Sequence, residues 1–106
     1  MRTIRVGVAG LGVVGRETIR LLAANREKFS RRLGASIELA AVADRQVERE
    51  AKALGLARSV FRARDPQKLA GHPDLDVVIE LLGGLEAPRK LVLGALAAGR
   101  HVVTAN

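Results

Sequence analysis

Residues 6–15 read Val-Gly-Val-Ala-Gly-Leu-Gly-Val-Val-Gly, and they join an apolar run to a helical pattern through a glycine turn. The apolar run, Ile4 to Ala9, predicts a β-strand, and the helical pattern begins near Val13. A strand that ends in Gly-x-Gly-x-x-Gly and leads directly into a helix is typical of the first half of a dinucleotide-binding βαβ unit. These residues therefore predict a parallel α/β fold with an anion-binding turn.

Each glycine of this turn has an expected role. Gly10 allows the tight turn, Gly12 lets a pyrophosphate approach the backbone, and Gly15 lets the helix lie close to the strand. The free N–H groups at the helix start, together with the positive end of the helix dipole, favour phosphate binding. The alternative is a strand-to-helix turn with no ligand. We expect the pyrophosphate to bind at six residues: Gly10, Leu11, Gly12, Val13, Val14 and Gly15.

Composition limits the chain to one domain and a small set of functions. The 106 residues are enough for one hydrophobic core, and 48% of them are hydrophobic, mostly Ala, Val and Leu. Such small side chains suit parallel strands that helices cover on both faces. Phe29 and Phe61 are the only aromatic residues, which argues against stacking of single-stranded nucleic acid.

Charge and residue usage exclude several further functions. The formal net charge is +7, and we interpret most of it as solvated surface, because no helix-turn-helix pattern or basic stripe is present. No nucleic-acid partner is expected. Cysteine is absent, and His72 and His101 lack metal-ligand spacing, so we expect no metal site. No apolar run approaches the ~20 residues of a membrane span, and no signal peptide precedes the first strand. A cytoplasmic location is therefore expected.

Apolar runs and helical patterns alternate along the whole chain. The first helix places Val14, Thr18, Leu21 and Leu22 on one face, and its pattern can continue to Leu33 before Gly34. Further strands are predicted at 37–43, 60–61, 76–82 and 101–104, and further helices at 46–54, from Asp65-Pro66, and at 86–98. This alternation predicts an α/β, Rossmann-type, doubly wound parallel sheet in three layers, with strand order 3-2-1-4-5.

In that order the first and fourth strands are neighbours, and ligands bind at their carboxyl ends. Asp44 ends the second strand, where a ribose hydroxyl is expected, and Arg45 can pair with a 2′-phosphate. Asp44 alone favours NAD and Arg45 favours NADP, so the pair fits either cofactor. Arg49, Arg62 and Arg64 are weaker candidates for the same phosphate.

The second half of the predicted sheet supplies the remaining candidate residues. Gly83-Gly84 follows the fourth strand and faces the glycine turn across the crevice, although these glycines can equally be a simple turn. Thr104 ends the fifth strand, near the expected nicotinamide. Glu80 interrupts an apolar strand. Its carboxyl group needs a hydrogen-bonding partner if it is buried; alternatively, it lies on a solvent-exposed face of the strand. We assign Glu80 no catalytic role.

Four segments together resemble the N-terminal NAD(P)-binding domain of homoserine dehydrogenase: residues 6–15, 41–45, 76–84 and 99–106. The similarity runs the length of the chain. Many dehydrogenases share the first segment, whereas Glu-Leu-Leu-Gly-Gly at 80–84 and His-Val-Val-Thr-Ala-Asn at 101–106 are much more specific. The resemblance implies an enzyme, typically a homodimer, that interconverts L-aspartate 4-semialdehyde and L-homoserine by hydride transfer in threonine and methionine biosynthesis.

The resemblance also implies residue roles. The glycine turn from Gly10 to Gly15 holds the pyrophosphate, and Asp44 and Arg45 contact the adenosine ribose or its phosphate. Four residues line the nicotinamide side: Gly83, Gly84, Thr104 and Asn106.

The chain departs from the family pattern at its end. In the family a lysine linked to catalysis follows the Thr-Ala-Asn segment, whereas this chain stops at Asn106 and lacks the substrate domain. We therefore expect residues 1–106 to be a single NAD(P)-binding domain without catalytic residues, inactive alone. The alternatives are the cofactor domain of another amino-acid dehydrogenase or reductase, similar to aspartate dehydrogenase or dihydrodipicolinate reductase, or a non-catalytic dinucleotide-sensing module.

Overall fold

The computed structural model describes residues 2–105, which form one five-stranded sheet with strand order β3-β2-β1-β4-β5. Every neighbouring pair of strands is parallel, so the predicted doubly wound sheet and its strand order are confirmed. β3 and β5 form the two edges of the sheet. The strands are β1 (Arg2–Ala9), β2 (Ala35–Ala43), β3 (Phe61–Ala63), β4 (Val77–Glu80) and β5 (His101–Thr104).

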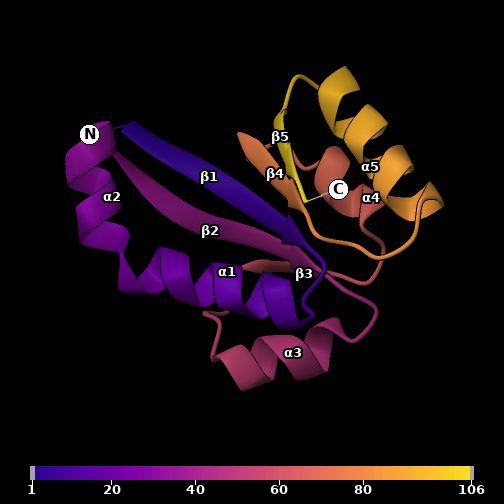
Figure 1. Cartoon of the computed structure of the whole chain (residues 1–106), viewed down its shortest axis with the longest axis horizontal. Coiled ribbons are helices and arrows are strands. Elements are labelled where there is room, and N and C mark those ends of the chain that lie inside the picture. Colours follow the sequence, from indigo (N-terminus) through magenta and orange to yellow (C-terminus); the bar gives the residue numbers. More distant parts are fainter. Residues whose placement is uncertain (1, 106) are drawn as a thin grey trace.

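Helices cover both faces of the sheet, which gives the predicted three layers. Figure 1 shows α1, α2 and α3 on one side of the strands and α4 and α5 on the other. The helices are α1 (Val13–Ala24), α2 (Arg26–Leu33), α3 (Val47–Leu54), α4 (Gln67–Ala70) and α5 (Glu86–Ala97). None of the helices in the described part of the chain is long and apolar enough to cross a membrane.

A separate hydrophobic cluster fills the space on each face of the sheet. Val8 and Val42 belong to the cluster under α1 and α3, together with Ile19, whereas Ala9 and Ala43 belong to the cluster under α4 and α5. Neighbouring residues of one strand point to opposite faces, so β1 and β2 supply both clusters. The small side chains of these strands let helices pack closely on both sides, as expected for a parallel sheet.

The first helical region is shorter than its sequence pattern indicates. α1 ends at Ala24, and α2 begins separately after Asn25. The backbone N–H and the side-chain Nδ2 of Asn25 both donate to the carbonyl oxygen of Leu21, at 3.0 and 2.9 Å. Asn25 therefore ends the first helix with its own amide. The predicted stop at Gly34 is confirmed, and so is the predicted end of the next helix at residue 54, where Gly55 is the C-cap.

The predicted apolar face of α1 is wrong at two of its four residues, since Thr18 and Leu22 are half-buried but the other two are not. Val14 and Leu21 are exposed, at 59% and 58%, whereas Gly15 and Ile19 are the buried residues of this helix. A Cβ atom on Gly15 would lie 1.9 Å from the carbonyl oxygen of Gly10. Gly15 lies against the end of β1, and Ile19, four residues later, lies on the same side of the helix. This side of α1, rather than the predicted one, therefore faces the sheet.

Smaller differences concern where elements begin and end. β3 spans Phe61–Ala63 rather than residues 60–61, and β4 ends at Glu80 rather than at Leu82. α4 begins at Gln67, just after the predicted start at Asp65-Pro66, and the Asp65 carboxylate accepts a hydrogen bond of 2.9 Å from the N–H of Gln67.

The contact between α1 and β1 predicts the stability of two glycine variants. We expect Gly15→Ala to lower the free energy of unfolding by about 1–3 kcal/mol, because the new methyl group meets backbone atoms that cannot move aside. Urea denaturation followed by circular dichroism measures this loss. Gly12→Ala is the matched control, since its Cβ would meet nothing within 4 Å. Equal stability of the Gly15 variant and the original chain would contradict the argument.

Candidate functional site

The carboxyl ends of β1 and β4 form the crevice that the topology predicts. The N–H of Leu81 donates to the Ala9 carbonyl at 2.8 Å, and the N–H of Gly10 donates to the Ala43 carbonyl at 2.8 Å. These bonds hold the segment that follows β4 beside the end of β1, and the segment that follows β1 beside the end of β2. A cleft of about 690 Å³ opens there, lined by Gly10, Gly12, Asp44, Arg45, Gln46, Arg64, Pro66, Leu81, Leu82, Gly83 and Ala87.

The glycine turn is crowded at one position and open at another. Gly10 has φ +98°, and a Cβ there would lie 2.6 Å from the carbonyl oxygen of Leu81, so the fold itself requires glycine. Gly12 has open space where a Cβ would stand, and it is the N-cap of α1 without a side-chain cap hydrogen bond. The first N–H groups of a helix have no partner within the helix. The residues therefore fit a phosphate group at Gly12.

Asp44 ties the end of β2 to the glycine turn. Its Oδ2 accepts a hydrogen bond of 2.7 Å from the N–H of Leu11, and its Oδ1 accepts one of 2.8 Å from the N–H of Gln46. Each carboxylate oxygen offers more than one lone-pair direction, so both can still accept from a ribose hydroxyl. The contact joins residues 33 apart in the sequence, and no local pattern indicates it.

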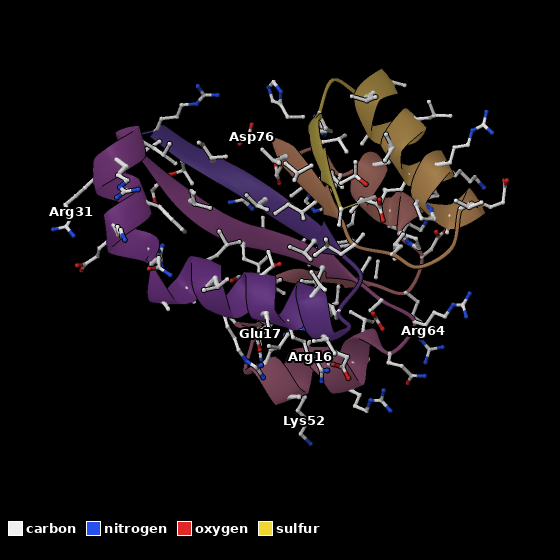
Figure 2. The ribbon with its side chains drawn as sticks, in the orientation of Figure 1. Arg16, Glu17, Arg31, Lys52, Arg64 and Asp76 are labelled. Carbon is white, nitrogen blue, oxygen red and sulfur yellow. The ribbon has the colours of Figure 1, made fainter. Side chains whose placement is uncertain are left out.

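Two of the candidate arginines lie at the cleft, on the same side as Asp44. Arg45 and Arg64 line the cleft and both are exposed; Figure 2 shows Arg64 extending outward where the β1 and β2 arrows end. Arg62 instead donates to three backbone carbonyls of residues 56–60, outside the cleft.

A smaller hollow lies beside the cleft, on the α3 side of Gly12. Arg16 lies on the side of α1 near α3 (Figure 2), and its Nη1 is 3.6 Å from Glu50 Oε2. Arg49 Nε lies 3.3 Å from Glu50 Oε1. The hollow, of about 240 Å³, is lined by Leu11, Gly12, Arg16, Asp44, Arg49 and Glu50. Sequence reasoning missed Arg16 and Glu50, since both match an ordinary surface pattern.

The remaining candidates follow or end β4 and β5; Gly83 lines the cleft, whereas Gly84 and Thr104 are not among its lining residues. Gly83 and Gly84 are exposed, and a Cβ on either would meet nothing within 4 Å. Thr104 is exposed at the end of β5, where its hydroxyl donates to Glu80 Oε1 at 2.5 Å. Glu80 is only 1% exposed, and its Oε2 accepts from the N–H of Leu82 at 2.7 Å. Glu80 is therefore buried with partners. Asn106 lies outside the described residues.

Within residues 2–105, no three His, Asp or Glu side chains form a group that could hold a metal ion. The His72 ring packs against Phe61 with ring centroids 4.8 Å apart, and His101 is exposed.

Comparison with known protein families identifies the family of this chain. The profile of the family described as "Homoserine dehydrogenase, NAD binding domain" matches residues 10–106. The chain belongs to this homoserine dehydrogenase family. The match includes the glycine turn and both segments that carry the resemblance seen in the sequence, which is therefore confirmed. It also supports NAD or NADP as the cofactor of this domain.

Individual homoserine dehydrogenases agree with this assignment. The chain is 41% identical to that of Methylobacillus glycogenes and 40% identical to that of Neisseria gonorrhoeae, each match covering all of this chain. The crystal structure of a homoserine dehydrogenase from Thiobacillus denitrificans superposes on the whole chain with a TM-score of 0.87 at 42% identity. The chain spans 25%, 24% and 24% of these three proteins, respectively. These matches favour homoserine dehydrogenase over the two alternatives considered above.

The contact between Asp44 and Leu11 predicts how the glycine turn responds to substitution. We expect Asp44→Ala to cost about 1–3 kcal/mol of unfolding free energy, because two backbone N–H groups lose their acceptor. Hydrogen exchange measured by NMR should show faster exchange at the amide of Leu11. Asp74→Ala, at an exposed aspartate before β4, is the control. Unchanged protection of Leu11 in the Asp44 variant would contradict the role given to this carboxylate.

Proposed function

We propose that residues 1–106 are the NAD(P)-binding domain of an enzyme that interconverts L-homoserine and L-aspartate 4-semialdehyde, as a step in threonine and methionine biosynthesis. The observation that carries the proposal is the open position at Gly12, beside Asp44, in a chain of this family. A nicotinamide dinucleotide, when bound, supplies the hydride acceptor or donor, and the protein supplies binding and orientation.

The proposed binding residues divide between the two halves of the sheet. On the first half, the glycine turn holds the pyrophosphate through its backbone, which involves Gly10, Leu11, Gly12, Val13, Val14 and Gly15. The exposure of Val13 and Val14, 71% and 59%, supports their placement beside the ligand. Asp44 accepts hydrogen bonds from the adenosine ribose, and Arg45 pairs with a 2′-phosphate when the cofactor is NADP.

On the second half, Gly83, Gly84, Thr104 and Asn106 contact the nicotinamide side. The support is positional, since β4 and β5 belong to the second mononucleotide half of a doubly wound sheet. Gly83 lines the cleft, and the absence of side chains at both glycines leaves room for the ligand. No described residue of this chain receives a catalytic role in the proposal.

The same proposal covers the substrate, the oligomeric state and the cellular location of the enzyme. Because the matched homoserine dehydrogenases are about four times as long as this chain, we assign substrate binding and the homodimer contacts to segments outside it. We propose a cytoplasmic enzyme that uses no nucleic acid or membrane as a partner.

A turnover measurement tests whether catalysis requires segments outside this chain. We expect the 106-residue chain alone to show no homoserine-dependent reduction of NADP or NAD, followed by absorbance at the nicotinamide band. A longer protein that contains this domain should show it. A measurable homoserine-dependent rate from the short chain alone would overturn the assignment of catalysis to other segments.

Calorimetric titration tests the cofactor site directly. If NADP binds more tightly than NAD, we expect Arg45→Ala to remove about tenfold or more of the NADP affinity and leave NAD unchanged, because a hydrogen bond to a charged group is lost. Arg58→Ala is the matched control, since Arg58 is an exposed arginine in the loop before β3.

Gly12→Ala should weaken the binding of both cofactors, because its methyl group takes the space offered to the pyrophosphate. Tight binding to a folded Gly12 variant would contradict the dinucleotide assignment of this turn.

A further inference from the structure

Glu80 is a buried carboxylate at the end of an otherwise apolar strand. It is 1% exposed, and it pairs in register with Ala9 of β1 on one side and Thr104 of β5 on the other. A buried charge is costly unless hydrogen bonds compensate for its lost hydration. Its two oxygens obtain them from the Leu82 N–H and the Thr104 hydroxyl.

The direction of the hydrogen bond between Glu80 and Thr104 follows from the chemistry of the two groups. A carboxylate can only accept, so the Thr104 hydroxyl must donate its proton to Oε1 across 2.5 Å. A hydroxyl has a single proton. The Thr104 oxygen can therefore face a ligand only as a hydrogen-bond acceptor.

The position of Thr104 indicates which part of a ligand it would meet. Thr104 ends β5 and is exposed, in the half of the sheet that holds the second mononucleotide of a dinucleotide. In a nicotinamide dinucleotide, that mononucleotide carries a carboxamide, whose amino group donates and whose oxygen accepts. An acceptor-only threonine matches the amino group.

We propose that Glu80 is a specificity-determining positioning residue, which fixes the Thr104 hydroxyl as an acceptor for the carboxamide amino group of the nicotinamide. This inference rests on the proposed function, because it requires a nicotinamide dinucleotide in the crevice. Glu80 acts through Thr104 and does not touch the ligand. The pair therefore selects a ring substituent that can donate a hydrogen bond.

Glu80→Gln reverses the polarity of the pair without changing its size. The glutamine oxygen can still accept from the Leu82 N–H, and its amino group then donates to the Thr104 oxygen. That arrangement releases the hydroxyl proton of Thr104 toward the ligand. The variant should therefore favour a substituent that accepts a hydrogen bond.

Calorimetric titration with three ligands separates these effects: NAD, the analogue in which a 3-acetyl group replaces the carboxamide, and ADP-ribose. The acetyl group accepts hydrogen bonds but cannot donate them. We expect the original chain to bind NAD about three- to tenfold more tightly than the analogue, as one neutral hydrogen bond implies. Glu80→Gln should bring this ratio to about one or below, while its affinity for ADP-ribose stays the same.

Further variants keep the test decisive. Thr104→Val should also abolish the discrimination, and Thr104→Ser, which retains the hydroxyl, should preserve it. Because Thr104 is exposed, these two variants decide the matter if Glu80→Gln does not fold. Glu48→Gln, at an exposed glutamate of α3, controls for the change in net charge.

Three results would overturn the inference. One is an original chain that binds NAD and the analogue equally, and another is a Glu80→Gln variant that binds all three ligands more weakly by the same factor, as a merely structural residue would. The third is an original chain that fails to bind ADP-ribose; this result would contradict the proposed dinucleotide-binding function as well as the inference. Binding of ADP-ribose without discrimination at the ring overturns the inference alone.

Discussion

The carboxyl end of β1 is so crowded that neither Gly10 nor Gly15 has room for a methyl group. A side chain on Gly10 would collide with the backbone after β4, and one on Gly15 would collide with Gly10 itself. This contact brings the start of α1, the end of β1 and the segment after β4 together. Gly12 stands between the two crowded positions yet faces open space. The same packing that excludes side chains at Gly10 and Gly15 leaves open space at Gly12, beside the first N–H groups of α1, which have no partner within the helix.

Two carboxylates hold the rims of this crevice in equivalent ways. Asp44 at the end of β2 accepts from the backbone of the glycine turn, and Glu80 at the end of β4 accepts from the backbone that leads to Gly83. Each joins one strand end to the loop beside it. In both cases the acceptor lies at or just after the end of a strand, and the donor lies in a loop. These hydrogen bonds preorganise the rims of the crevice, which lowers the conformational entropy that binding of a ligand there would have to overcome.

Local patterns predicted most of the fold, and long-range contacts account for what they missed. The alternation of apolar runs with helical patterns was sufficient for the strand order, because right-handed crossovers leave few arrangements. Two residues of the α1 face, Val14 and Leu21, were predicted wrongly because periodicity favours large side chains. The packing of this helix depends on Gly15, which has no side chain to count. Glycine spacing located the crevice correctly. The partner of Glu80 lies 24 residues away and is recognisable only once the register of β4 and β5 is known.

The edge position of β5 has a consequence for how the chain behaves at high concentration. Within the described residues β5 pairs with β4 alone, and its outward Val103 is 54% exposed. A four-residue edge strand leaves a row of backbone donors and acceptors on which another strand can add. β3, at the opposite edge, has only three residues. Self-association of the 106-residue chain should therefore begin at β5, and a lysine in place of Val103 is the change that would keep solutions of it monomeric.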